Sequence, residues 1–225
     1  MSGKLIVIEG LDGSGKATQT ALLCEALEKM GKKIRRITFP DYKEPSSALI
    51  KMYLGGEFGD DPGAVNAYAA SSFYAVDRFA SFIKFWKDFY LAGGLVIADR
   101  YATSNAIYQM GKLPKSGWDE YLSWLEDFEY GKLMLPKPDL VLYFDMPVSV
   151  SQRLMSGRYQ GDESRKDLHE RNVSFLQNCR NSALYAADKL CWRTVECAEG
   201  QKAKSRESIH AQVMDIVREV VTHSC

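Results

Sequence analysis

Residues 4–18 read KLIVIEGLDGSGKAT, and this stretch decides the fold. A short apolar run, 4–9, passes directly into a glycine-rich segment, and a helical pattern follows from Lys16. The glycines permit backbone angles that point successive N–H groups at a phosphate, and the helix N-terminus adds partial positive charge. The GxxxxGK spacing therefore predicts a phosphate-binding loop between a strand and a helix. A purely structural glycine turn is the alternative, and the lysine and the strand–helix context argue against it.

The rest of the chain alternates in the same way. Short apolar runs that read as strands occupy 4–9, 34–39, 95–99, 139–145 and 192–197. Helical patterns occupy 16–30, 63–91, 118–131, 148–156, 167–189 and 205–221, with Gly31 and Gly93–Gly94 as stops. Nearly continuous apolar strands indicate a parallel sheet covered on both faces. We expect an α/β fold, a three-layer doubly wound sandwich with a five-stranded parallel sheet of the P-loop NTPase type.

The amino-acid composition excludes several classes of protein for this chain. The chain has 225 residues, 46% hydrophobic and 26% charged, which is typical of a globular protein, and we expect a single domain over 1–225. The 29 basic and 29 acidic residues cancel, which argues against a broad nucleic-acid face. No apolar run approaches the roughly 20 residues of a membrane helix, and the N-terminus lacks a signal-peptide pattern, so a cytoplasmic location is expected. The five cysteines form no CxxC pair, which favours reduced thiols.

A second motif, Asp99-Arg100, ends the apolar run 95–99. The carboxyl ends of parallel strands form one crevice, so Asp99 would face the glycine-rich loop and could hold Mg²⁺ directly or through water. Arg100 could bind an acceptor phosphate, although a surface pair at a strand end is the alternative. Ala17 stands where a phosphate loop usually has a Ser or Thr ligand to Mg²⁺. Either Thr18 or a water replaces that hydroxyl, or metal binding is weakened.

Together these motifs resemble those of the thymidylate kinase family. The matching pieces are IEGLDGSGKATQ at 8–19, Phe39-Pro40, VDRFA at 76–80, DRYATSNAIYQ at 99–109 and DLHERNVSFL at 167–176. They occur in the family's order over most of the chain. The resemblance implies transfer of the terminal phosphoryl group of ATP to dTMP, with Mg²⁺ as cofactor and a homodimer as the usual assembly.

The resemblance also implies a donor site and an acceptor site. ATP-binding residues would be Gly10, Leu11, Asp12, Gly13, Ser14, Gly15, Lys16, Ala17, Thr18 and Arg153. Residues binding dTMP would be Asp12, Phe39, Pro40, Tyr74, Arg78, Arg100, Asn105, Tyr108 and Gln109. The metal would be held by Asp99 and Thr18, and the catalytic residues would be Asp12, Lys16, Arg100 and Arg158.

Several acceptor-site residues have specific implied roles. Tyr74 precedes Arg78 by four residues, which places both on one helical face, where the ring could stack on a base and the guanidinium could donate to its carbonyl. By resemblance, Asn105 binds the base edge and Tyr108 closes the C2′ side of the sugar. Core packing is the alternative for both tyrosines, and a role at a helix start is the alternative for Asn105. Ser104 could cap that helix.

The segment 152–166 has the glycines and polar residues of a lid that opens and closes. Some family members carry a cation at the position of Gly13, which is neutral here. We therefore expect a lid arginine, Arg158 with Arg153 as a second candidate, to meet the charge of the transferred phosphoryl group or to stack on adenine. A solvated basic loop is the alternative.

Two other functions compete with the first. One is a different P-loop nucleotide kinase, and the other is a nucleotide-binding regulator without catalysis, which Ala17 suggests. The absence of an NKxD motif argues against a GTPase. The aromatic segment 63–91 would be either fully buried or partly a subunit face.

Overall fold

A computed structural model describes residues 3–158, 168–169 and 172–222, except for the side chains of 156–158 and 222. Its centre is a five-stranded sheet in the order β2-β3-β1-β4-β5, and all neighbouring strands are parallel. The strands are β1 (Lys4–Gly10), β2 (Ile34–Thr38), β3 (Leu95–Asp99), β4 (Leu140–Asp145) and β5 (Arg193–Glu196). The predicted five-stranded parallel sheet is confirmed.

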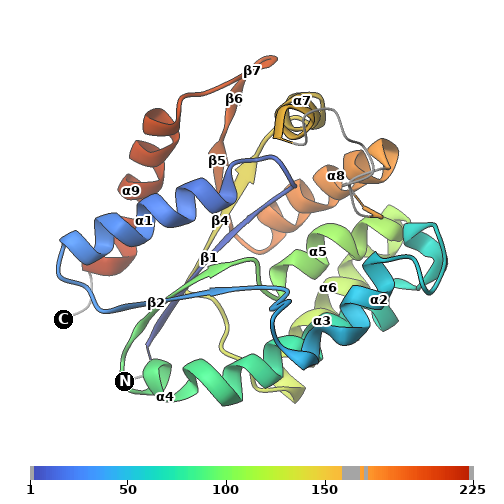
Figure 1. Cartoon of the computed structure of the whole chain (residues 1–225), viewed down its shortest axis with the longest axis horizontal. Helices are drawn as coiled ribbons and strands as arrows, with labels where there is room; N and C mark the ends of the chain where they lie inside the picture. Colours follow the sequence, from blue (N-terminus) through green and yellow to red (C-terminus); the bar gives the residue numbers. More distant parts are fainter. Residues whose placement is uncertain (1–2, 159–167, 170–171, 223–225) are drawn as a thin grey trace.

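Helices cover both faces of the sheet (Figure 1). The helices are α1 (Lys16–Lys29), α2 (Ala48–Leu54), α3 (Ala67–Ser81), α4 (Lys87–Leu91), α5 (Thr103–Tyr108), α6 (Trp118–Glu126), α7 (Val148–Arg158), α8 (Val173–Lys189) and α9 (Arg206–Thr222). Helices α1 and α9 lie together on one face, whereas α3, α5, α6 and α8 lie on the other. A small antiparallel ribbon, β6 (Ala198–Glu199) with β7 (Lys202–Ala203), precedes α9. The three-layer sandwich is therefore confirmed.

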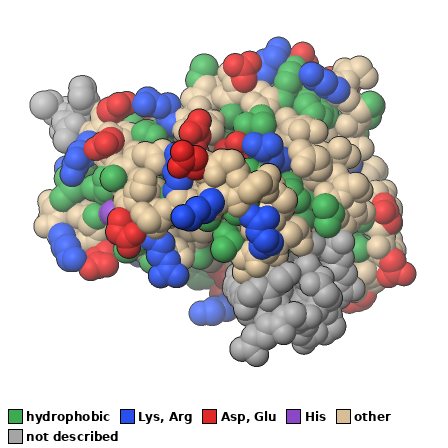
Figure 2. All heavy atoms as spheres, turned by 90° about the horizontal axis from the view of Figure 1, so that it is seen from above, with side chains coloured by type: hydrophobic (Ala, Val, Ile, Leu, Met, Phe, Trp, Pro, Cys, Tyr) green, Lys and Arg blue, Asp and Glu red, His purple; other side chains and the backbone are tan. Residues whose placement is uncertain are grey.

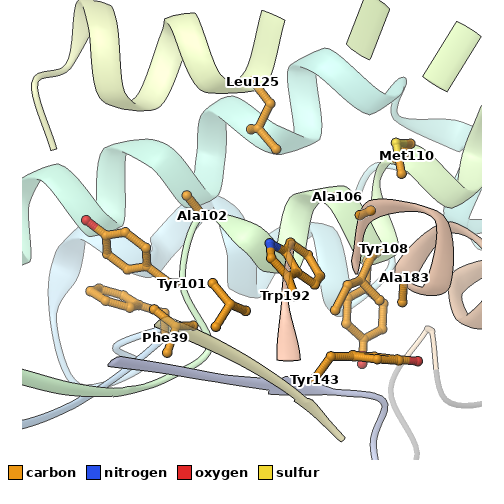
Figure 3. Close-up of a cluster of buried hydrophobic side chains, with 14 of the residues drawn as sticks. Phe39, Tyr101, Ala102, Ala106, Tyr108, Met110, Leu125, Tyr143, Ala183 and Trp192 are labelled. Atoms are coloured by element: carbon orange, nitrogen blue, oxygen red, sulfur yellow. The ribbon is translucent and has the colours of Figure 1, made fainter. Parts of the chain in front are cut away.

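The two faces of the sheet bury different apolar residues because side chains alternate along a strand. On β1, Leu5 and Val7 join the cluster beneath α5, α6 and α8, part of which Figure 3 shows. Ile6 and Ile8 point the other way, into the cluster beneath α1 and α9. The strand is thus buried on both sides, as its continuous apolar sequence predicts.

The predicted helix over 63–91 is not continuous. Asn66 caps α3 by accepting from the Ala69 N–H at 2.9 Å, so the helix begins at Ala67. The backbone then widens into a π-helical segment, Phe82–Trp86, before α4 continues to Leu91. Helix α6 likewise ends in a π-helical segment, Asp127–Lys132. π-helical segments of this kind often occur at functional sites.

The segment 167–189 also begins later than predicted. Asn172 caps α8 by accepting from the Phe175 N–H at 2.9 Å, while Leu168 and His169 form a turn. Of the predicted lid 152–166, α7 covers 152–158, and 159–166 lie outside the described residues. Helix α2 and the β6–β7 ribbon were not predicted. Within the described residues, no helix is both long and apolar enough to cross a membrane.

Candidate active site

The glycine-rich loop connects β1 to α1 at the carboxyl end of the central strand. Gly13 and Gly15 have φ angles of 78° and 89°, in the region that favours glycine, and Gly15 is the N-cap of α1. Lys16 is buried, and its Nζ donates to the Leu11 carbonyl at 2.8 Å. The ammonium group is therefore held inside the loop, as a phosphate-binding loop requires.

Gly13 leaves no room for a side chain. A Cβ atom there would lie 2.8 Å from the Ser151 carbonyl oxygen and 2.9 Å from Met155 Cγ, both on α7. Helix α7 thus packs directly on the loop. A cation carried at position 13 would not fit beside this helix.

Asp12, Arg100 and Tyr108 form one hydrogen-bonded group beside the loop. Arg100 Nη2 donates to Asp12 Oδ1 at 2.6 Å, and the Tyr108 hydroxyl donates to Asp12 Oδ2 at 2.9 Å. Arg100 Nη2 also lies 3.2 Å from the Tyr108 hydroxyl oxygen, and its guanidinium lies 5.1 Å from the centre of that ring. The loop after β1 and the segment after β3 therefore meet at one point.

A cavity opens beside this group, and we call it the Tyr108 cavity. All nine residues predicted to bind dTMP line it: Asp12, Phe39, Pro40, Tyr74, Arg78, Arg100, Asn105, Tyr108 and Gln109. The other lining residues are Tyr42, Leu54, Tyr101, Ser104 and His169. Aromatic rings and a few convergent polar groups are typical of a small-ligand site.

A larger space, which we call the loop groove, follows the glycine-rich loop. Residues 12–18, which are predicted to bind ATP, line it together with Asp99, Arg100 and part of the chain around β7 and α9. Gly10 and Leu11 lie buried beneath it and do not line it. Arg153 does not line it either, since its guanidinium donates to the Gln201 carbonyl in the β6–β7 turn.

The Tyr108 cavity and the loop groove share one boundary. Asp12 and Arg100 line both, as do Phe39, Pro40 and Tyr42. A ligand in one space would therefore meet a ligand in the other at the Asp12–Arg100 pair. This is the arrangement that a transfer reaction between two bound molecules requires.

A family model described as thymidylate kinase matches residues 8–209. The chain belongs to the thymidylate kinase family. The thymidylate kinase of Mycobacterium tuberculosis is 33% identical over 184 residues, 81% of this chain and 84% of the relative. The probable thymidylate kinase of Thermococcus gammatolerans is 31% identical over 221 residues, 97% of this chain and 98% of the relative. The solved thymidylate kinase of Candida albicans has the same fold, with a TM-score of 0.71 and 23% identity over 99% of this chain and 94% of that one.

Membership of the thymidylate kinase family makes this chain a phosphotransferase whose activity is phosphorylation of dTMP, with ATP and dTMP as substrates. The electrostatics of the site agree with that chemistry. Burial raises the pKa of Asp12, but the positive charges of Arg100 and Lys16 lower it by more. The pKa of Asp12 is therefore below its usual range. Burial, aided by the charge of Arg100, lowers the pKa of Lys16 to about 8.

Glu9, which the sequence analysis did not single out, organises the turn after β3. Its buried carboxylate accepts from the Tyr101 N–H at 3.0 Å, from Thr103 Oγ1 at 2.7 Å and from Ser104 Oγ at 2.8 Å. Burial raises the pKa of Glu9 despite these bonds and the nearby Arg100. Ser104 is therefore not the cap of α5, which begins at Thr103, because its hydroxyl is bonded to Glu9.

Arg78, which lines the Tyr108 cavity, forms a buried ion pair that was also missed. Arg78 donates through Nε to Glu129 Oε2 at 3.1 Å and through Nη2 to Glu129 Oε1. The two side chains are 1% and 0% exposed. Glu129 lies in a helical pattern rich in surface charges, so the sequence offered no sign of its partner.

Two further side chains shape the cavity. Asp77 accepts from the Asp41 N–H at 2.9 Å and from Ser46 Oγ at 2.6 Å, which fixes the segment after the cis Phe39-Pro40 bond. The His169 ring stacks on Tyr108 at 5.5 Å and lies 2.8 Å from the Tyr53 hydroxyl. Burial and the charge of Lys112 lower the pKa of His169 to about 3, so its ring is neutral. The resemblance over 167–176 was the only sequence indication of His169.

The last two predicted features of the site are the metal ligands and the lid arginine. Asp99 and Thr18 both line the loop groove, whereas Ala17 offers no hydroxyl. Within the described residues, no group of three His, Cys, Asp or Glu side chains could hold a metal by itself. Arg158 ends α7, and its side chain lies outside the described residues.

Proposed function

We propose that this chain binds ATP in the loop groove and dTMP in the Tyr108 cavity, and forms ADP and dTDP. A phosphate oxygen of dTMP attacks the γ-phosphorus of ATP, the bond to the β–γ bridging oxygen breaks, and ADP leaves with that electron pair. The observation that carries the proposal is the shared boundary of the two spaces at Asp12 and Arg100. Holding both reactants there lowers the entropic cost of their encounter.

On the acceptor side, Arg100 binds the phosphate of dTMP and neutralises its charge. Its guanidinium stays charged at every accessible pH, and Asp12 orients it through the 2.6 Å hydrogen bond. Because the pKa of Asp12 is lowered, its carboxylate remains ionised and can also accept from the sugar 3′ hydroxyl. Tyr108, which binds Asp12, excludes a 2′ hydroxyl.

The base is recognised at the cavity floor. Arg78 donates to a carbonyl of thymine, and Asn105 bonds the base edge. Tyr74 supplies a stacking surface, and Phe39, Pro40 and Gln109 complete the lining. These side chains bind a neutral planar ring with hydrogen-bonding groups on one edge.

On the donor side, loop amides and Lys16 bind the phosphates of ATP. Because Gly13 cannot carry a cation, we propose that Arg158 at the end of α7 supplies positive charge to the transferred phosphoryl group. We also propose that 152–166 acts as a lid and that 1–225 forms a single domain. Asp99 and Thr18 provide oxygen donors suited to Mg²⁺, which commonly takes one or two protein ligands besides phosphates and water. When bound, Mg²⁺ would neutralise phosphate charge.

We also propose a homodimer in the cytoplasm without nucleic-acid binding. An exposed apolar stripe of Val76, Phe79 and Ile83, on α3 and the π-helical segment after it, supports self-association. Cys24, Cys179, Cys191 and Cys197 are free thiols, which suits a reducing compartment. On the face that Figure 2 shows, basic and acidic side chains are interspersed and form no continuous basic surface.

Turnover with a panel of acceptors tests the proposal. The protein is mixed with ATP, Mg²⁺ and one of dTMP, dUMP, UMP, CMP or thymidine, and ADP formation is followed. We expect dTMP to be the best acceptor, dUMP weaker, and UMP, CMP and thymidine poor. Equal rates with UMP would contradict the role of Tyr108 and favour a different nucleotide kinase. Absence of ADP above background with every acceptor would favour a non-catalytic regulator.

A further inference from the structure

Glu129 is a charged residue at a position that the fold would normally fill with an apolar one. It follows Leu125 by four residues, and Tyr121, Leu122 and Leu125 form the buried side of α6. A buried ion pair is a poor source of stability compared with apolar packing of the same volume. A carboxylate at this position therefore indicates a role beyond holding the fold.

The partners of Glu129 indicate that role. Besides Arg78, its Oε1 accepts from Asn105 Nδ2 at 3.4 Å, a long bond, and Asn105 Nδ2 also lies 3.5 Å from the Ser71 carbonyl. Glu129 thus contacts both side chains that face the base in the proposed function. It lies behind them and does not itself line the Tyr108 cavity.

An ionised carboxylate accepts hydrogen bonds and never donates them. It therefore holds Asn105 with its amide nitrogen toward Glu129, which leaves the Oδ1 atom to accept from a ligand. It also holds Arg78 by the Nε and Nη2 edge. Arg78 Nη1 carries two N–H groups, and its 3.5 Å contact with the Tyr101 carbonyl uses at most one of them. The floor thus offers one donor and one acceptor to a ligand.

We propose that Glu129 is a positioning residue that sets the hydrogen-bonding polarity of the cavity floor and so selects a 4-oxo pyrimidine over a 4-amino pyrimidine. Thymine and uracil present an acceptor at C4 and a donor at N3, which match Arg78 and Asn105 Oδ1. Cytosine presents the reverse pattern, a donor at C4 and an acceptor at N3. The inference rests on the proposed function because it requires the base to lie in the Tyr108 cavity.

The test compares dUMP with dCMP, which differ only at these two positions of the base. In the parent protein, kcat/KM for dUMP should exceed that for dCMP by at least about 100-fold, since a wrong donor or acceptor leaves buried polar groups unpaired. Glu129→Gln offers both a donor and an acceptor, so Asn105 can reverse. We expect the dUMP-to-dCMP ratio to fall at least about tenfold and KM for dTMP to rise, while KM for ATP stays within about twofold.

Glu126→Gln is the matched control, because Glu126 lies on the same helix and pairs with Lys137 at 2.6 Å near the surface. Glu126→Gln should leave the ratio of kcat/KM for dUMP to kcat/KM for dCMP unchanged. If Glu129→Gln lowers the melting temperature but keeps the parent ratio, Glu129 is only structural and the inference is overturned.

A second measurement does not depend on the variant folding. A crystal structure of the parent with dTMP should show Arg78 and Asn105 bonded to the base while both still contact Glu129. A base bound elsewhere, or Asn105 turned with Oδ1 toward Glu129, would overturn the inference. If the parent turns over dTMP but shows either result, the proposed function stands and the inference alone fails. If the parent does not turn over dTMP, both fail.

Discussion

Arg100 shows how a single residue is held for phosphate binding. Its φ angle of 68° is unusual for a residue other than glycine and carries a small energetic cost. The Arg100 N–H donates to the Ile8 carbonyl at 3.0 Å, and its side chain reaches Asp12 and the Gly10 carbonyl. The backbone angle thus turns the guanidinium from the end of β3 toward the loop after β1.

Lys16 predicts a pH dependence of ATP binding. Its pKa of about 8 means that the charged form falls from about nine-tenths at pH 7 to about one-tenth at pH 9. Because phosphate binding favours charged Lys16, we expect Kd for a non-hydrolysable ATP analogue to rise about tenfold between these pH values, as measured by calorimetry. Binding of dTMP is the internal control, since Arg100 keeps its charge. A constant Kd for the analogue would show that Lys16 does not titrate in this range.

At the scale of elements, α7 covers the glycine-rich loop and also carries an arginine that is predicted to be catalytic. It packs on Gly13, and it carries both Arg153 and Arg158. The Arg153 guanidinium is bonded to the Gln201 carbonyl and does not line the loop groove. The two arginines therefore allow a comparison within one helix.

We expect Arg158→Ala to lower kcat at least about 100-fold, because a cation that meets the transferred phosphoryl group acts mainly in the transition state. Affinity for dTMP should change little. Arg153→Ala should have a much smaller effect on kcat. Steady-state kinetics with both variants would check this, and an unchanged kcat in Arg158→Ala would show that the lid assignment is incorrect.

Helix α3 and the π-helical segment after it have two apolar sides. Phe82 and Trp86 are buried, whereas Val76, Phe79 and Ile83 are 54%, 41% and 48% exposed. The exposed residues are three and four positions apart, so they form one stripe on the surface. Burial and a subunit face were the alternatives that the sequence left open for this aromatic segment, and its residues are divided between the core and this exposed side. A contiguous exposed apolar stripe indicates an interaction surface.

If this stripe forms the homodimer interface, Ile83→Glu should produce a monomer, because a charge would be buried without a partner. Light scattering after size exclusion would measure the mass. Met134→Glu, at a position 77% exposed, is the control and should keep the parent mass. A parent protein that is monomeric at micromolar concentration would contradict the proposed dimer.

At the scale of the molecule, the Tyr108 cavity is built from the loop after β1, the segments after β2 and β3, and helices α2, α3 and α5, together with His169. A ligand that contacts all of them binds the folded state and not the unfolded chain. At 100 times its Kd, dTMP should stabilise the fold by about 2.7 kcal/mol and raise Tm by about 5–10 °C. Scanning calorimetry would measure this shift in Tm. Thymidine lacks the phosphate that Arg100 binds, so at the same concentration it should raise Tm by less. Equal shifts with both ligands would argue against a phosphate site at Arg100.

The sequence by itself determined the features that depend on local pattern. Apolar periodicity located all five strands of the parallel sheet, and the spacing of Gly10 and Lys16 located the loop, because both are read from neighbouring residues. All nine residues that the family resemblance implies as dTMP ligands line the Tyr108 cavity. The phosphotransferase activity followed from the same motifs.

Only the tertiary structure decided which distant side chains pair. Glu129 lies 51 residues from Arg78, and Glu9 lies 95 residues from Ser104, so no spacing rule connects them. The π-helical segments and the direction of Arg153 depend on packing between elements as well. Hydrogen bonds between buried groups form only after the sheet and helices bring those groups together, and for that reason the polarity of the cavity floor could not be read from the chain alone.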